Sequence, residues 1–435
     1  MTALLAVSGD EIVATLTHAN GKTSLRYDET WRTDFDTYPL SLSMPLSTDL
    51  HSHSTVEPFL WGLLPDNELV LDRWAKRFQV SARNAFRLIA NVGEDCPGAI
   101  QFVRPERLDS LLAGANDSIT WLSSSDLAGR MRTLRDDAGA GRVARDTGQF
   151  SLAGGQPKTA LLRKGNRWGI PSGRIPTTHI LKPASRDFDG HAENEHLCLA
   201  AANALELVAA RSEVVHFDDV SVIVVERFDR ASADGQFLRI HQEDMCQALR
   251  VHPAQKYQNM GGPGPREIVA LLRSSVYQPP LEGADPEAVE DAAETDVWRF
   301  LDALFFNWLI GGTDAHAKNY SVLIGSGGLV RLAPLYDLAS IFAYPDIDER
   351  RAKLAMRVAD KYRLDEIQLR HWQRLAQQVR VDADALVERI RDLAAALPPV
   401  LSDQASALRR QGIDHPALAR LTDGVARFTS KVLRM

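Results

Sequence analysis

The spacing of hydrophobic residues changes along the chain, and each change predicts a different kind of element. Residues 1 to about 50 alternate short apolar and polar runs such as EIVATLTH, TSLRYD and PLSLSMPL between Asn-Gly or Pro, which predicts a small β-rich module. From VEPFLWGLLPDNELVLDRW onward the apolar spacing becomes three and four, which predicts helices. We expect an N-terminal unit over residues 1–105, followed by a loop-rich linker over residues 106–149.

Residues 150–235 combine strand-like runs with one strong helix. FSLAGGQPKTALLRKGNRWGIP predicts a strand, a tight Gly turn and a strand, and THILKPAS and VSVIVVERFDR predict two more strands. Between these two, HAENEHLCLAAANALELVAA predicts a helix whose apolar face holds Leu197, Ala201, Ala204, Leu205 and Val208. Strands, a strand bearing a Lys, a helix bearing Glu and a further strand are the order of a kinase-like small lobe.

Residues 236–435 are predicted to be mainly helical. VWRFLDALFFNWLI is apolar on every face, so we expect it in the middle of a domain. We therefore predict an α+β, protein-kinase-like fold of two lobes, with a β-rich N-terminal subdomain and a mainly helical C-terminal lobe.

Polar residues follow that apolar helix at once, in GGTDAHAKNY. Asp314 and Asn319 have the D-x-x-x-x-N spacing of a kinase catalytic loop, a predicted hairpin follows in YSVLIGSGGLVRLAP, and Asp337 comes after it. Because Mg²⁺ on phosphates needs hard oxygen ligands, the set predicts phosphoryl transfer with Asp314 as base and Asn319 and Asp337 as metal ligands. Helix capping by Asp314 is the plainer interpretation. A zinc site using Asp314 and His316 is a second alternative.

Cationic residues offer candidate phosphate contacts. Lys318 either neutralises a transferring phosphate or faces solvent. Gly154 and Gly155 allow close backbone approach, with Lys158 as a point charge, although this is no Walker A loop. Lys182 is the candidate for the strand Lys that contacts the α- and β-phosphates. Its helix partner is Glu195 or, alternatively, Glu193, and the run ERFDR at 226–230 is the candidate adenine-binding hinge.

Composition narrows the function classes. The 435 residues carry a formal net charge of -7 and a pI near 6.0, which argues against broad electrostatic wrapping of DNA by this chain alone. Cys96, Cys198 and Cys246 are an odd number and widely spaced, so structural disulfides are not expected. The first residues lack the pattern of a signal peptide, and no apolar run approaches the ~18 residues of a membrane span. A cytoplasmic protein without a membrane partner is expected.

The motifs SLAGGQPKTALL, THILKP, VERFDR, QEDMCQAL, FNWLIGGTDAHAKNYSVLI and LAPLYDLAS, in this order, resemble the HipA family of serine/threonine-protein kinase toxins. PLSLSMPLS and LWGLLPDN resemble its N-terminal subdomain. The resemblance implies ATP and Mg²⁺ as cofactors, Asp314 as catalytic base and Ser151 as an autophosphorylated serine. The expected cofactor-binding residues are Ala153, Gly154, Gly155, Gln156, Pro157, Lys158, Lys182, Glu226, Arg227, Phe228, His316, Lys318, Asn319, Tyr336 and Asp337.

The resemblance also implies partners. Family members phosphorylate a cytosolic protein, an aminoacyl-tRNA synthetase and glutamyl-tRNA synthetase in particular, which stops growth and produces persister cells. A HipB-like helix-turn-helix antitoxin neutralises them, and the pair co-represses its own operon. The antitoxin supplies most contacts to operator DNA. Two alternatives stay open, a small-molecule kinase of related fold and a catalytically idle co-repressor. Pro157 is a departure that stiffens the loop and leaves the target in doubt.

Overall fold

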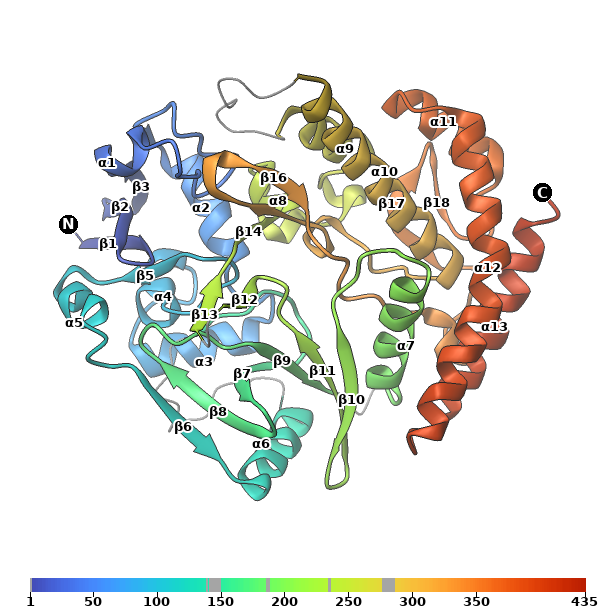
Figure 1. The fold of residues 1–435 in the computed structure, drawn as a ribbon, viewed down its shortest axis with the longest axis horizontal. Helices are drawn as coiled ribbons and strands as arrows, with labels where there is room; N and C mark the ends of the chain where they lie inside the picture. Colours follow the sequence, from blue (N-terminus) through green and yellow to red (C-terminus); the bar gives the residue numbers. More distant parts are fainter. Residues whose placement is uncertain (1, 138–139, 141–149, 185–187, 234–235, 276–285) are drawn as a thin grey trace.

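The computed structural model describes residues 2–137, 140, 150–184, 188–233, 236–275 and 286–435. The N-terminal part, at the left of Figure 1, is built on an antiparallel sheet in the order β4-β3-β2-β1-β5. Its strands are β1 Thr2–Ser8, β2 Glu11–Ala19, β3 Lys22–Tyr27, β4 Leu50–His51 and β5 Gln101–Val103. The run PLSLSMPL is not one of these strands, because its chain turns between Ser41 and Met44, which form an isolated bridge.

Helices complete the N-terminal core. They are α1 Glu29–Thr33, α2 His53–Gly62, α3 Glu68–Phe78, α4 Ala85–Val92, the 3-10 turn η1 Pro105–Arg107 and α5 Leu108–Leu112. Phe59 of α2 and Phe86 of α4 are among the largest fully buried side chains, and both pack with Leu4, Leu16 and Leu25 of the sheet. Burial of such side chains is worth ~1.5–3 kcal/mol each, so the predicted change from strand to helix spacing gives one packed unit.

A second sheet has the order β10-β11-β9-β7-β8-β6 and lies at the bottom of Figure 1. Its strands are β6 Ser118–Leu122, β7 Thr159–Lys164, β8 Arg167–Ser172, β9 His179–Pro183, β10 Ser212–Phe217 and β11 Val220–Glu226. β7 and β8 turn at Gly165, whose φ is +59°, and not at the Gly pair upstream.

The expected linker over 106–149 needs correction across its described part. β6 pairs with β8 along its whole length, and α6, Ser124–Asp136, begins with a capping box on Ser123. Leu127 and Met131 of α6 are buried against the strands of this sheet. The expected loop DDAGAGRVARDTG, residues 136–148, lies largely outside the described residues, which omit 138–139 and 141–149. β6 and α6 are therefore part of the small lobe, whereas α5 packs on Val7 and Val103 of the N-terminal sheet.

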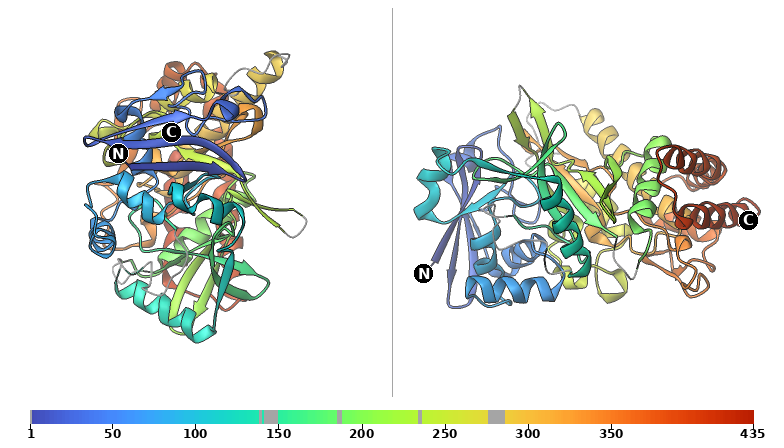
Figure 2. Two further views of the ribbon diagram at one scale, coloured as in Figure 1. Left: turned by 90° about the vertical axis from the view of Figure 1, so that its left-hand side faces the viewer. Right: turned by 90° about the horizontal axis from the view of Figure 1, so that it is seen from below.

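Helix α7, His191–Ala204, lies between this sheet and the C-terminal helices (Figures 1 and 2). Leu197 and Ala201 are fully buried, as the helical spacing predicted. The predicted face does not extend to Val208, whose side chain is 51% exposed. The helix ends earlier because Glu206 takes a left-handed backbone conformation with φ of +61°.

The C-terminal lobe is mainly helical, and its buried side chains form most of the largest hydrophobic cluster in the described residues. Its helices are α8 Met245–Ala248, α9 Pro265–Ser274, α10 Pro286–Ile310, α11 Leu369–Val379, α12 Ala383–Arg410 and α13 Pro416–Val432. Short turns are η3 Pro253–Gln255, η4 Gln258–Met260, η5 Ala317–Asn319, η6 Ser326–Gly328 and η7 Ile341–Ala343. Trp308 and Phe305 of α10 are buried among its neighbours, as predicted for a helix that is apolar all round.

Three small antiparallel sheets lie in the described residues from 230 onward. β14 His241–Asp244, β15 Ser321–Ile324 and β16 Val330–Leu332 form one antiparallel sheet, and β12 Arg230–Ala233 pairs with β13 Gln236–Arg239. β17 Lys353–Val358 pairs with β18 Lys361–Arg363. The predicted hairpin after GGTDAHAKNY is therefore present as β15 and β16. Within the described residues no helix has the length and the apolar run needed to cross a bilayer.

Gly311 explains how α10 turns into the polar loop. Its φ is +68°, a conformation that other residues adopt at a cost, and an added Cβ would lie 2.9 Å from a ring carbon of Phe342. The helix therefore ends against the core, and the chain enters the loop containing Asp314 at a fixed position.

Candidate active site

Lys182 of β9 lies at the centre of the candidate site. Its Nζ donates to Glu195 Oε1 of α7 and to Asp337 Oδ1, each at 2.7 Å. Glu193, the alternative partner, instead accepts a hydrogen bond from Ser221. Strand, helix and the segment after β16 thus meet at one ammonium group.

The charges at this point stabilise one another. Burial opposes the charged form of Lys182, but Asp337 and Glu195 raise its pKa above its usual value. Burial alone would raise the pKa of Asp337, but Lys182 and then Lys158 hold it well below its usual range. Asp337 is therefore a carboxylate at neutral pH, and 35% of its side chain is open to solvent.

The backbone at Asp337 is in an uncommon conformation. Its φ is +58°, which for a residue with a Cβ typically costs ~1 kcal/mol or more. Just before it, Leu335 exchanges backbone hydrogen bonds with Val208 and Ala210, which anchors the segment. Such strain is often found at functional sites, and here it accompanies the turn that places the carboxylate on Lys182.

The loop after α10 holds Asp314 and Asn319 together. Asn319 Nδ2 donates to the backbone oxygen of Asp314 at 2.9 Å, and so does the His316 N–H at 2.8 Å. Asp314 is exposed, whereas His316 and Asn319 are buried. Burial lowers the pKa of His316 to about 4, so its ring is neutral. In the part of the chain that the structure describes, no group of three or more His, Cys, Asp or Glu is arranged to hold a metal.

The Gly-rich segment lies against the N-terminal part. Gly154 forms a bridge with Pro65, and Lys158 Nζ donates to the Ala153 oxygen at 2.8 Å. Burial and the nearby Lys182 lower the pKa of Lys158 to about 8. A pocket opens beside this segment, lined by Pro65, Asn67, Val70, Trp74, Phe150, Leu152, Gly154, Gly155, Gln156 and Lys158.

Ser151 is fully buried. Its hydroxyl donates to the Leu63 oxygen at 2.6 Å, and its N–H donates to the Asp95 oxygen at 3.0 Å. Nothing in this position offers the hydroxyl to solvent.

Lys318 does not face solvent, and its partner comes from the N-terminal part. Its side chain is 3% exposed and donates to Asp66 Oδ1 at 2.6 Å, while Lys256 donates to Oδ2 of the same carboxylate at 2.8 Å. These two cations, acting against burial, lower the pKa of Asp66. Asp66 also donates its N–H to the Gly154 oxygen, so it joins the Gly-rich segment to the catalytic loop. No spacing pattern along the chain indicated this contact.

Tyr336 and Phe228 lie together beside the loop. Their rings are 5.5 Å apart, and the Tyr336 hydroxyl lies 2.6 Å from the Lys318 oxygen and 2.6 Å from Ser321 Oγ. Glu226 is exposed, and its N–H donates to the Arg211 oxygen.

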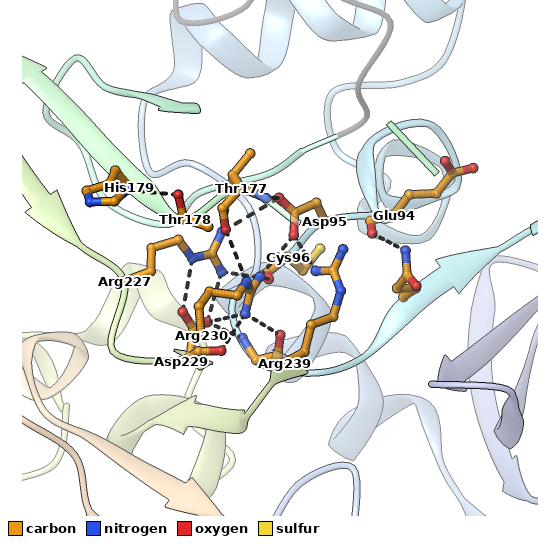
Figure 3. A network of polar contacts seen from close by, with 12 residues as sticks. Glu94, Asp95, Cys96, Thr177, Thr178, His179, Arg227, Asp229, Arg230 and Arg239 are labelled. Carbon is orange, nitrogen blue, oxygen red and sulfur yellow. Dashed lines mark hydrogen bonds and ion pairs between the residues drawn. The ribbon is translucent and has the colours of Figure 1, made fainter. Parts of the chain in front are cut away.

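The side chain of Arg227 belongs to a buried network of ion pairs, and the expected contact of the hinge backbone with adenine stays a prediction. Figure 3 shows its guanidinium between Asp95 and Asp229, beside Arg230 and Arg239. Arg227 donates to Asp229 Oδ1 at 3.0 Å and Oδ2 at 2.8 Å, and its N–H donates to the Thr178 oxygen. Because Asp95 precedes β5 and Asp229 follows β11, these ion pairs join the N-terminal part to the small lobe.

A Lys on a strand bound to a helix Glu, beneath a Gly-rich segment and next to an Asp that follows a hairpin, defines a protein-kinase-like enzyme. Residues 150–401 match the HipA-like C-terminal domain, and residues 4–103 match the HipA N-terminal domain. The chain belongs to the HipA family.

Individual relatives agree with this assignment. The protein named "Putative kinase Y4mE" of Sinorhizobium fredii is 34% identical over 94% of this chain and 92% of its own length. The serine/threonine-protein kinase toxin HipA of Shewanella oneidensis is 28% identical over 87% of this chain and 83% of its own. The chain is therefore a protein kinase of the HipA type, which uses ATP.

A solved structure matches over the full length. The Shewanella oneidensis toxin–antitoxin complex of HipA, HipB and operator DNA contains a chain with a TM-score of 0.79 and 24% identity, covering 99% of both chains. The predicted α+β, kinase-like fold is confirmed.

Proposed function

We propose that this chain is a toxin that transfers the γ-phosphoryl group of ATP to a serine of a cytosolic protein, with Asp314 as the base. The serine oxygen attacks the γ-phosphorus, the bond from this phosphorus to the β,γ-bridging oxygen breaks, and ADP leaves. The serine proton passes to Asp314 and then to solvent. The observation that carries the proposal is the contact of Lys182 with both Glu195 and Asp337, beside a loop that leaves Asp314 exposed.

The charged residues fit ATP and Mg²⁺. Lys182 would contact the α- and β-phosphates. Lys158 lies close enough to Lys182 for the two charges to interact, so both could attract the phosphates. Asn319 uses its amide nitrogen on the Asp314 backbone, which leaves the amide oxygen for a metal, and Asp337 supplies a carboxylate. Both donors are the hard oxygens that Mg²⁺ prefers. When bound, Mg²⁺ supplies positive charge to the phosphate oxygens.

Other residues are proposed to shape the nucleotide site. Gly154 and Gly155 offer backbone N–H groups without side chains, and Gln156 and Pro157 complete the segment that begins at Ala153. Neutral His316, Tyr336 and Phe228 would provide ring surfaces, and the backbone of the segment from Glu226 is proposed to meet the adenine. The side chain of Arg227 would support this segment by its ion pairs with Asp95 and Asp229.

Ser151 is proposed as the regulatory phosphorylation site. A phosphate adds a charge of about -1.5 to -2, which cannot stay at a fully buried hydroxyl bonded to the Leu63 oxygen. Phosphorylation would therefore expel the Gly-rich segment, separate Lys158 from the nucleotide site and switch the kinase off.

The proposed partners follow from the relatives. A HipB-like antitoxin and operator DNA are favoured because the matching solved structure contains both, and an acidic chain leaves most DNA contacts to the antitoxin. We propose a cytoplasmic aminoacyl-tRNA synthetase, with glutamyl-tRNA synthetase first, as the substrate. Purified synthetases offered with γ-labelled ATP would identify it, and a labelled band other than glutamyl-tRNA synthetase would overturn that choice.

Incubation with γ-labelled ATP, Mg²⁺ and bacterial lysate tests the kinase itself. The wild type should label a protein band, and Asp314→Asn, which keeps the shape of the side chain, should lower the initial rate by roughly 10²- to 10⁴-fold. Equal labelling by both proteins would refute Asp314 as base. Label in metabolites alone would indicate a small-molecule kinase, and no label at all would favour a co-repressor without catalysis. Equal growth arrest on expression of the wild type and Asp314→Asn would refute the link between kinase activity and arrest.

A further inference from the structure

The loop between α8 and α9, residues 252–264, packs on the loop that contains Asp314. Its sequence is HPAQKYQNMGGPG. The Lys256 oxygen accepts the Ala317 N–H at 3.3 Å, and Gln258 Oε1 accepts the Arg357 N–H at 2.8 Å. The loop therefore contacts both η5 and β17.

Glycine keeps this loop tightly folded. Gly262 donates its N–H to the Tyr257 oxygen at 3.0 Å. A Cβ on Gly262 would lie 2.1 Å from the Gln255 oxygen and 2.8 Å from the Tyr257 oxygen, closer than real Cβ contacts. The backbone at Tyr257 is consequently fixed from both sides.

Tyr257 uses this fixed position to reach the candidate base. Its hydroxyl donates to Asp314 Oδ1 at 2.5 Å, and its ring meets the ring of His316 edge on at 5.0 Å. Burial, followed by the hydrogen bond to Asp314, raises the pKa of Tyr257, so the phenol keeps its proton and stays a donor at neutral pH. Among the residues that the structure describes, no donor is recorded for Asp314 Oδ2.

We propose that Tyr257 is a positioning residue that holds the carboxylate of Asp314 by one oxygen, so that Oδ2 faces the incoming serine hydroxyl. This inference rests on the proposed role of Asp314 as base. An exposed Asp can rotate about its last bond, and a base must lie within hydrogen-bond reach of the proton it removes. One short hydrogen bond from a rigid loop limits that rotation and leaves the other oxygen open.

Tyr257→Phe in the full-length protein tests the proposal, because it removes only the hydroxyl. With γ-labelled ATP, Mg²⁺ and the lysate band that the wild type labels, kcat should fall by roughly 10- to 100-fold, while the KM for ATP stays within about twofold. The thermal midpoint should stay near that of the wild type. Tyr38→Phe, which removes a phenol bonded to Ser8 in the N-terminal sheet, is the matched control and should keep the wild-type rate.

A double-mutant cycle shows whether Tyr257 acts through Asp314. In an Asp314→Asn background, Tyr257→Phe should have no further effect on the rate. Asp314→Glu, which keeps a displaced carboxylate, serves as a second background if the Asn variant is too slow to measure, and there the effect of Tyr257→Phe should also shrink.

Several results would overturn the inference. They are an unchanged rate in Tyr257→Phe, a loss of equal size in all backgrounds, or a loss accompanied by weaker ATP binding and a lower thermal midpoint. A faster Tyr257→Phe enzyme would also overturn it, since the phenol would then compete with the substrate hydroxyl. Full activity of Asp314→Asn alone would instead refute the proposed base, so the two failures are distinguishable.

Discussion

The small lobe contacts two buried networks of charged side chains. They differ in how many of their carboxylate oxygens are already bonded to protein donors. Around Arg227, the side chains of Arg227, Arg230 and Asp229 are each 2% exposed. The single oxygen Oδ2 of Asp229 accepts from Gly98, Arg227 and Gln242. Figure 3 shows Asp229 beside Arg227 and Arg230. Around Lys182, the Asp337 side chain is 35% exposed. Both oxygens of Asp229 are thus occupied by protein donors, whereas Asp337 in the candidate active site keeps carboxylate surface within reach of a ligand.

The same chemical change in each network gives the sharpest test of this difference. Asp337→Asn should lower kinase activity most, by roughly 10³-fold or more, because it removes a proposed metal ligand and a charge beside Lys182. Its cost in stability should be small, since Lys182 keeps Glu195 and Asn adopts a positive φ readily. Initial rates of label transfer and the thermal midpoint measure both effects. An active variant, or one that unfolds at a much lower temperature, would contradict the comparison.

Asp229→Asn should show the opposite pattern. Removing one partner from a buried ion pair typically costs ~3–5 kcal/mol, and here two guanidinium groups would lose a counter-charge. Denaturant unfolding should show this loss, while the folded protein at low temperature keeps a rate within about threefold of wild type. The double variant Arg227→Gln with Asp229→Asn should recover part of the stability. A stable but inactive Asp229→Asn protein would place this network in the active site instead.

The sequence was informative where the chemistry is local. Asp314 and Asn319 are in one loop, and the hairpin that carries the chain to Asp337 has its own strand signals. The pattern along the chain therefore predicted both the loop and the hairpin. Asp66 and Tyr257 were missed because their partners are distant in sequence: Asp66 lies 252 positions from Lys318, and Tyr257 lies 57 from Asp314. Only packing of the N-terminal part and of loop 252–264 against the catalytic loop brings them there.

The fold shows the same limit. The apolar α10 and the strands β7, β9 and β11 were predicted because their patterns are strong within each segment. β6 was not, because its residues are at most half-buried and its identity as a strand depends on pairing with β8. The side-chain partners of Arg227 were likewise missed, because Asp95 comes from a different part of the chain. The adenine contact of the ERFDR backbone stays a prediction.

A change at Glu243, a single buried acid outside both networks, should have the smallest effect, and that effect is on the pH dependence of stability. Glu243 Oε1 accepts the Leu42 N–H at 2.7 Å, whereas Oε2 is buried and has no hydrogen-bond partner among the residues that the structure describes. Burial raises the pKa of Glu243 to about 8. The folded protein thus binds a proton that the unfolded chain, with an ordinary Glu pKa near 4.5, releases. Its contribution to stability is fully present below about pH 4.5 and declines as pH rises toward 8, by at most ~1.4 kcal/mol per pH unit.

Glu243→Gln should remove this pH dependence, because the amide keeps an oxygen for Leu42 and has no proton to lose. Thermal midpoints measured between pH 5 and pH 8.5 should therefore fall less steeply in the variant, and the variant should be the more stable protein at the upper end of that range. The kinase rate should not change, since Glu243 of β14 bonds to Leu42 of the N-terminal part and to neither Lys182 nor Asp314 in the described residues. If wild type and variant show parallel pH profiles, Glu243 is ionised in the folded protein, and an unpaired buried carboxylate is tolerated at this junction.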